Sequence, residues 1–173
     1  IKIRFDIEIE WLLYICVNLP KTFKPLSKQS IKKITKFKDS FDNKSVLKIK
    51  KIESPTNHDV KAVEYYIRDY FLKDKVLSTY THLIHFGLTS EDINSLSYAH
   101  MIKNGIFIYV KELDKVNKIL KNYAKKWAKQ PFLARTHGQA ASPSTLGKEF
   151  KVFHERINKE MQHLKSIKPL AKF

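Results

Sequence analysis

The sequence predicts an all-α fold in which long helices are joined by loops. Glycine and proline, which interrupt helices, are scarce: the 173 residues include 4 Gly and 6 Pro. Apolar residues recur at helical spacing in several segments, as they do on the buried face of an amphipathic helix. A hydrophobic content of 43% supports a folded core, and the length corresponds to one domain or to parts of two.

The first helix is expected over residues 1–17. Polar and apolar residues alternate over residues 1–10, which is also the pattern of a strand. The stretch fits helical spacing as well, and its length favours a helix; the apolar positions are Ile1, Phe5, Ile9, Leu12 and Cys16. Pro20 and Pro25 then bracket a loop, because proline lacks an amide donor and restrains the residue before it.

Two further segments are expected to lead into helices. A basic amphipathic helix is predicted from about Ser27 to Ser40, and Asp42-Asn43-Lys44 after it has the composition of a turn. The segment Ser54–Asp59 is rich in cap-type residues, so a loop is expected to enter a helix there. The apolar residues of that helix are Val60, Val63, Ile67, Tyr70 and Phe71.

The longest helix is expected from Ser90 to about Ala128. Thr89 as its N-cap, with Asp92 three residues later, resembles a capping box. Gly105 lies inside this helix and is expected to mark a kink or a point of close packing.

The last helix is predicted to follow a loop from Gln130 to Ala141. Ser142 is its expected N-cap and Pro143 its first residue, a position that proline favours. Apolar residues then form one stripe, made of Leu146, Phe150, Phe153, Ile157, Met161 and Leu164.

The formal net charge of +16 raises the alternative of a helical nucleic-acid-binding module. Only four of the 33 basic residues are arginine, the residue that makes bidentate contacts to phosphates and bases. The lysines are scattered over the whole length. A lysine-rich, solvated surface is therefore favoured over a nucleic-acid partner, and it is compatible with attraction of an anionic small substrate.

Other classes are excluded more directly. The lone cysteine, Cys16, excludes an internal disulfide framework and a Cys-based zinc cluster, and no ligand spacing indicates another metal. No apolar run approaches the roughly 20 residues of a membrane span, so no membrane partner is expected. The sequence shows no signal peptide. It opens in mid-pattern without Met at position 1 and ends at Phe173 without a terminating signal, and we expect it to be incomplete at both ends.

Three polar clusters lie where helices are expected to begin, and helix N-termini attract anions. Helix capping is the favoured explanation of Thr56–Asp59 taken alone. In the second cluster capping explains Thr89, Ser90 and Asp92, but it does not explain His85 or Gly87. The third cluster, Arg135–Gln139, combines a glycine, which permits close approach to a ligand, with His137, which is suited to proton transfer near neutral pH. Together the clusters predict an anion-binding site distributed over the chain.

The clusters resemble three segments of adenylosuccinate lyase, a member of the fumarase/aspartase superfamily. The similar runs are Thr56-Asn57-His58-Asp59-Val60-Lys61-Ala62-Val63-Glu64-Tyr65, Thr89-Ser90-Glu91-Asp92-Ile93-Asn94-Ser95-Leu96-Ser97, and Arg135-Thr136-His137-Gly138-Gln139 followed by Ser142-Pro143-Ser144-Thr145-Leu146-Gly147-Lys148-Glu149. The resemblance is closest to the bacterial-type branch. Fumarases typically carry Leu where this chain has Gly138, so adenylosuccinate lyase is favoured and another lyase of the superfamily remains the alternative.

The resemblance implies a carbon–nitrogen lyase that releases fumarate by β-elimination. Its substrates are adenylosuccinate, which gives AMP, and the succinyl-carboxamide ribotide of purine biosynthesis. His137 corresponds to the general acid on the leaving nitrogen, and His58 to a histidine that supports it. The expected substrate-binding residues are Asn57 and Asp59 beside His58, Thr89 and Ser90 on the succinyl carboxylate, and His85 and Thr136 nearby. No metal or organic cofactor is implied.

The resemblance also implies an architecture. It predicts an N-terminal helical domain over residues 1–78 and the first part of a central helical-bundle domain of the fumarase/aspartase type over residues 79–173. In the family the enzyme is a cytoplasmic homotetramer whose active sites are shared between subunits. The family's catalytic base, a Ser in a Gly-Ser-Ser-Met-Pro loop, and its phosphate-binding Arg-Tyr pair do not occur in this sequence. We therefore expect this chain alone to be inactive.

Overall fold

The computed structural model describes residues 1–172 and is helical apart from one small sheet. The chain forms two compact units: one comprises Ile1–His100 and the residues from Leu170 onward, and the other comprises Met101–Pro169. The division falls inside a single long helix, so it is distinct from the predicted domain boundary after residue 78, which stays a prediction. Phe173, the last residue of the predicted second domain, lies outside the described residues.

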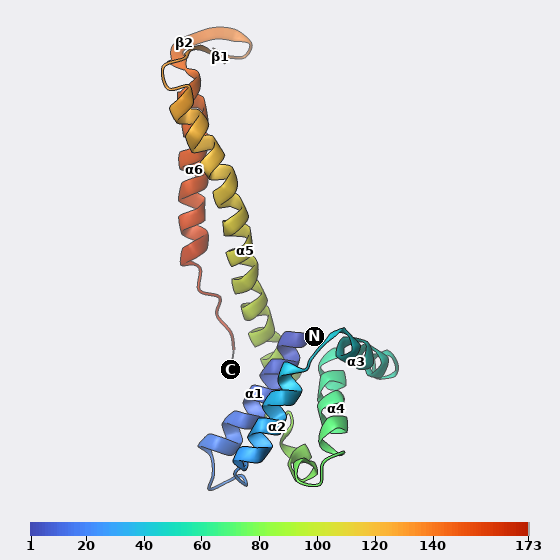
Figure 1. Ribbon diagram of the computed structural model, residues 1–173. Coiled ribbons are helices and arrows are strands. Elements are labelled where there is room, and N and C mark those ends of the chain that lie inside the picture. The colour runs from blue at the N-terminus through green and yellow to red at the C-terminus, as the bar shows by residue number, and fades with distance from the viewer. Residues whose placement is uncertain (173) are drawn as a thin grey trace. The chain divides into compact units, whose positions relative to one another are not determined.

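The first unit is built from short and medium helices (Figure 1). They are α1 (Lys2–Asn18), α2 (Lys28–Asp39), α3 (Asn43–Thr56), α4 (Asp59–Phe71), the 3-10 helix η1 (Leu77–Leu83) and the beginning of α5 (Ser90–Lys126). The helices predicted over residues 1–17 and from Ser27 to Ser40 are confirmed, and so is the loop that contains Pro20 and Pro25. The helix, rather than the strand, forms at residues 1–10 because it places the apolar residues at helical spacing, Ile1, Phe5 and Ile9, against one core.

That core contains side chains from every helix of the first unit before α5. Its buried members are Phe5, Ile9, Leu12, Ile15, Cys16, Ile34, Phe37, Ile49, Ala62, Val63, Ile67, Phe71, Leu77, Tyr80, Leu83 and Ile84. Phe5 packs edge-on against Phe37 at 5.2 Å between ring centroids, and Phe37 stacks on Tyr70 at 3.6 Å. Burial of such side chains is the main stabilising term, at about 1.5–3 kcal/mol for each large one.

The starts of α2 and α3 are capped by side chains. The Ser27 hydroxyl accepts a hydrogen bond from the Ser30 amide, and Asp42 exchanges hydrogen bonds with Ser45 in a capping box. The turn predicted at residues 42–44 is therefore wrong, because Asn43 and Lys44 already belong to α3. An aspartate side chain that accepts a hydrogen bond from an amide a few residues later is typical both of turns and of helix starts. The sequence alone therefore did not distinguish a turn at residues 42–44 from the start of a helix.

The second unit contains most of α5 and the helix α6 (Leu146–Ser166), joined by an antiparallel hairpin of β1 (Pro131–Thr136) and β2 (Gln139–Thr145). The long helix predicted from Ser90 to about Ala128 is confirmed. The predicted loop is a hairpin instead, in which Pro143 lies in β2 opposite Leu133. Proline fits there because each strand of a two-stranded sheet has a free edge that needs no donor.

The N-cap predicted at Ser142 is also wrong: the Thr145 hydroxyl accepts from the Lys148 amide at 3.2 Å and caps α6. Near this end α6 comes very close to α5, since a Cβ added at Gly147 would lie 2.5 Å from the Ala124 carbonyl oxygen. The close packing point expected at Gly105 is not found, because a Cβ there would have no atom within 4 Å among the described residues. Among residues 1–172, no helix has the length and apolar character to cross a membrane.

Candidate active site

The first cluster spans the junction of α3 and α4, because Thr56 ends α3 and Asp59 begins α4. The loop predicted over Ser54–Asp59 is therefore wrong at its start: Ser54–Thr56 form the last turn of α3, and only two residues separate the helices. Asn57 has a left-handed backbone, with φ of 48°, and ends α3. Asparagine tolerates this conformation better than most residues. His58 is the N-cap of α4, and its Nδ1 accepts a hydrogen bond from the Lys61 amide at 3.2 Å. The capping role expected for this segment is thus filled by the histidine ring.

A contact between His58 and Ser90 joins the first cluster to the second. His58 Nε2 lies 3.3 Å from Ser90 Oγ, although the two residues are 32 positions apart in the chain. Because Nδ1 accepts a hydrogen bond from the Lys61 amide, a neutral His58 ring carries its proton on Nε2. Nε2–H then donates the hydrogen bond to Ser90 Oγ. The structure therefore brings two of the predicted site residues together at the starts of α4 and α5.

The start of α5 has the predicted capping box. The Thr89 amide donates to Asp92 Oδ2 at 2.7 Å, and the Asp92 amide donates to Thr89 Oγ1 at 3.4 Å. The backbone and side-chain hydrogen bonds from Thr89 lower the pKa of Asp92. Thr89 thus orders the start of α5, directly beside Ser90.

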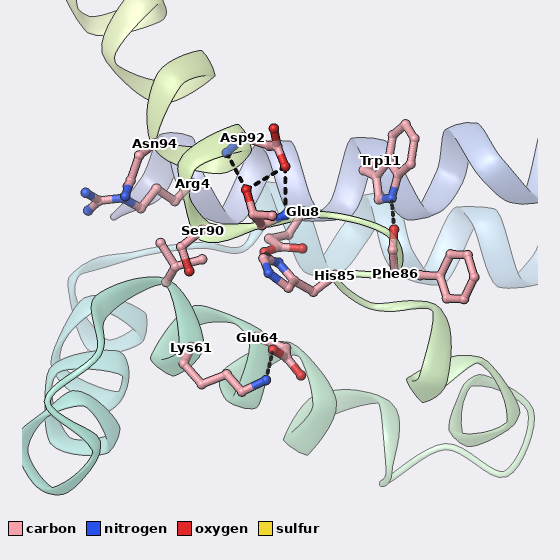
Figure 2. A network of polar contacts seen from close by, with 12 residues as sticks. Arg4, Glu8, Trp11, Lys61, Glu64, His85, Phe86, Ser90, Asp92 and Asn94 are labelled. Carbon is pink, nitrogen blue, oxygen red and sulfur yellow. Dashed lines mark hydrogen bonds and ion pairs between the residues drawn. The ribbon is translucent and has the colours of Figure 1, made fainter. Parts of the chain in front are cut away.

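Arg4 of α1 links both helix starts. Its Nη2 lies 2.9 Å from Asp59 Oδ2, and its Nε donates to Asn94 Oδ1 at 2.8 Å. The Arg4 side chain is 16% exposed, so its charge is partly desolvated where it holds these groups. Figure 2 shows Arg4 and Asn94 in this network. Sequence reasoning missed Arg4, for which the available signal was that arginine occurs only four times.

His85 lies in the segment before α5 and contacts α1. Its backbone is left-handed, with φ of 61°, which is uncommon for a residue other than glycine. Its Nδ1 lies 2.6 Å from Oε1 of Glu8, whose side chain is fully buried. The hydrogen bond to Glu8 raises the pKa of His85. Trp11 Nε1 donates to the Phe86 carbonyl at 2.8 Å and ties the same segment to α1.

Glu8 was also missed, although the sequence holds a signal for it. It comes three residues after Phe5 and four before Leu12, so it shares the buried face of α1. A charged residue at such a position needs a partner or a function.

The remaining predicted residues, Thr136 and His137, belong to the second unit. Thr136 pairs with Gln139 across the hairpin, so His137 and Gly138 form a two-residue turn. Their φ angles are 51° and 77°, as a type I′ turn requires. His137 is therefore exposed at the tip of a hairpin, and Arg135 Nη1 lies 3.5 Å from the Gly138 carbonyl oxygen within the turn.

The first unit thus gathers six of the eight predicted site residues around the starts of α4 and α5, and the second unit carries the other two. Helix starts, a serine hydroxyl and imidazole rings suit the binding of an anion. Within residues 1–172 no three His, Cys, Asp or Glu side chains are grouped so that they could hold a metal ion.

Comparison with known proteins identifies the class to which this helical fold and polar site belong. The family model described as Lyase matches residues 11–172, and the chain belongs to this family. More particularly, it is similar to adenylosuccinate lyases: it is 37% identical to that of Buchnera aphidicola subsp. Schizaphis graminum over 175 residues, which cover 99% of this chain and 38% of the relative. It is 35% identical to that of Escherichia coli (strain K12), with coverages of 99% and 38%. The resemblance inferred from the three motifs is thereby confirmed.

Solved structures agree on the fold. The fumarate lyase from Mesorhizobium sp. BNC1 superimposes with a TM-score of 0.72 at 16% identity, over 94% of this chain and 36% of that one. The 3-carboxy-cis,cis-muconate lactonizing enzyme from Pseudomonas putida gives 0.71, also at 16% identity, over 95% and 36%. The predicted fold class is confirmed. The chain spans about 38% of the length of the curated relatives named above.

Proposed function

We propose that this chain forms part of an adenylosuccinate lyase. The reaction is β-elimination: a proton leaves the succinyl Cβ, the C–N bond breaks with its electrons passing to nitrogen, and fumarate and AMP separate. The succinyl-carboxamide ribotide reacts in the same way. The observation that carries the proposal is the His58–Ser90 contact at 3.3 Å, which joins two of the motifs shared with that enzyme at two helix starts. Sequence identity of 35–37% to adenylosuccinate lyases supports it.

The proposed roles follow the motifs. His137 protonates the leaving nitrogen, for which an exposed ring at a hairpin tip is sterically suited. Thr89 and Ser90, at the N-terminus of α5, bind a succinyl carboxylate with support from the helix dipole. His58 positions Ser90, and Asn57, Asp59, His85 and Thr136 complete the surroundings of the substrate. The base that removes the Cβ proton comes from outside this chain, and the reaction requires no metal or organic cofactor.

The proposed assembly is a cytoplasmic homotetramer with shared active sites. Large apolar side chains on α5 support it, because unpaired apolar faces of this kind mark interaction surfaces. Those at least half exposed are Tyr98, Ile102, Phe107, Ile108, Tyr109 and Ile119.

A chimera tests the activity. This chain replaces the matching segment of the Escherichia coli relative, and fumarate release from adenylosuccinate and other succinyl substrates is measured. We expect turnover of adenylosuccinate, and a loss of about 100-fold or more in kcat for the His137→Gln variant, as general acids contribute. A folded, tetrameric chimera without turnover would contradict the proposal, and turnover of a different succinyl substrate would favour another lyase of the superfamily.

The unfused chain and a nucleic acid provide two further controls. The 173-residue chain alone is expected to release no fumarate. Its binding to duplex DNA is expected to be weak at both of two salt concentrations; tight binding with a steep salt dependence would instead support the nucleic-acid alternative raised by the charge of +16.

A further inference from the structure

The Glu8 carboxylate is an unusual group to find inside the first unit. Its side chain has no exposed surface, and it lies on α1 among the apolar residues of the core. Oε1 contacts His85 Nδ1 at 2.6 Å, while Oε2 has no hydrogen-bond partner among the described residues. A buried charge left half-satisfied is costly, so its presence in this core points to a role beyond stability.

The contact fixes the state of the His85 ring. A carboxylate only accepts hydrogen bonds, so Nδ1 of His85 must carry the proton in this contact. The other ring nitrogen, Nε2, is then the atom left for a ligand, on a side chain that is 17% exposed. The backbone of His85 is left-handed, with φ of 61°, and the ring lies against Glu8 of α1.

The charges around His85 favour a protonated ring. The hydrogen bond and charge of Glu8 on α1 raise the pKa of His85, whereas burial lowers it; Glu64 on α4 raises it further and Lys61 on α4 lowers it. Asp92 at the start of α5 also interacts with the ring. Glu64 is already paired with Lys61 at 2.7 Å, so Glu8 is the dominant partner. Figure 2 shows the His85 ring between Glu8 and the two α4 residues.

We propose that Glu8 is a positioning residue of the candidate active site: it holds His85 as an imidazolium through Nδ1–H, so that Nε2–H donates to a carboxylate or phosphate group of the substrate. The arrangement is that of a carboxylate that orients a histidine in a catalytic triad, here applied to substrate binding rather than to proton removal. The substrate part of this proposal rests on the proposed lyase function, whereas the coupling of Glu8 to His85 does not.

The coupling is tested by titrating the histidine Cε1–H resonances of the full chain by NMR. The His85→Gln variant assigns the His85 signal by its disappearance. Glu8→Gln keeps an acceptor for Nδ1–H but removes the charge, and Glu8→Ala removes both. We expect the pKa of His85 to fall by about one pH unit or more in both Glu8 variants, as loss of an adjacent opposite charge does.

Glu10→Gln is the matched control, because Glu10 is on the same helix but is 59% exposed and pairs with Lys38. It should leave the His85 titration unchanged. An unchanged titration in a folded Glu8→Gln variant, with circular dichroism as the check of folding, overturns the proposal.

The substrate contact is tested in the active chimera. Glu8→Gln is expected to raise KM about tenfold with little change in kcat, as loss of a charge-assisted hydrogen bond does, and to move the alkaline limb of kcat/KM to lower pH. Inhibition by fumarate and by AMP distinguishes the two anions, since the product whose affinity falls carries the group that His85 binds. If Glu8→Gln has the same KM, pH profile and product inhibition as the wild type, the proposed substrate contact is overturned. An inactive wild-type chimera counts against the lyase function instead, and the NMR titration still decides the coupling.

Discussion

The two units of this chain hold their site residues in different ways. In the first unit the candidate residues are tied by contacts from distant helices, such as Arg4 to Asp59 and Glu8 to His85. In the second, Thr136 and His137 are placed by a two-residue turn at an exposed hairpin. The cores differ likewise: 16 buried residues form the cluster in the first unit, whereas Val110 and Met161 are the buried apolar residues that the described part of the second unit provides.

This difference shows that one part of a chain can fix its site residues through several tertiary contacts, while another part carries them exposed on a turn. Groups fixed by several distant contacts lose little entropy on binding a ligand. The turn fixes the backbone conformation of His137 at the hairpin tip, but the His137 side chain is exposed. The following expectations probe this contrast, beginning with the largest effect.

Truncation in the core of the first unit should be the most damaging change. Phe71→Ala removes a fully buried ring from α4 and is expected to lower the free energy of unfolding by about 3–5 kcal/mol. Phe107→Ala on α5, where the ring is 71% exposed, should change it by less than about 0.5 kcal/mol. Urea denaturation followed by circular dichroism measures both, and equal losses would show that the second unit is as well packed as the first.

Arg4→Ala should come next. It leaves Asp59 and Asn94 without their shared partner and is expected to cost about 1.5–3 kcal/mol. Arg135→Ala in the hairpin removes only a 3.5 Å contact to a carbonyl and should cost less than about 0.5 kcal/mol. Thermal unfolding measures both variants. Equal losses of stability in Arg4→Ala and Arg135→Ala would contradict the view that only the first unit holds its site residues through distant contacts.

Two glycines of the second unit test where its helices pack closely. Gly147→Ala places a Cβ 2.5 Å from the Ala124 carbonyl oxygen and should destabilise the protein by about 1–3 kcal/mol. Gly105→Ala meets open space inside α5 and should stabilise it by about 0.5–1 kcal/mol. Opposite signs in the melting temperature are expected; a destabilising Gly105→Ala would reveal packing against Gly105 that the isolated chain lacks.

The smallest expected effect is on the loss of stability at acidic pH. Hydrogen bonds from Lys33 and from the Leu77 and Val76 amides lower the pKa of Asp74 from 3.8 to about 2. Since the folded-state pKa is depressed, the contribution of Asp74 to stability is present above pH 3.8 and is lost as the pH falls toward 2. Asp74→Asn should therefore flatten the decline of the urea midpoint between these values. The exposed Asp69→Asn is the control, and a decline unchanged in Asp74→Asn would exclude this role.

Much of the fold could be read from the sequence because helix signals are local. The long helix from Ser90 and its Thr89–Asp92 capping box depend on residues within one turn of each other, and both were predicted correctly. The start of α6 was misplaced because Ser142 and Thr145 are both competent caps, and only the pairing of β1 with β2 assigns residues 139–145 to a strand. Strand pairing is decided by contacts that neither segment specifies alone.

The sequence by itself did not predict α3 or η1, but it determined α1, α2, α4, α5 and, apart from its start, α6, together with the three polar clusters and, through their resemblance, the family. The tertiary structure decided what connects them: Arg4 to Asn94 across 90 positions, Glu8 to His85 across 77 and His58 to Ser90 across 32. Periodicity shows that Glu8 lies on a buried face, but it does not name the partner. Partners so distant in the chain meet only when the helices pack, because packing supplies the burial and the geometry that local propensity lacks.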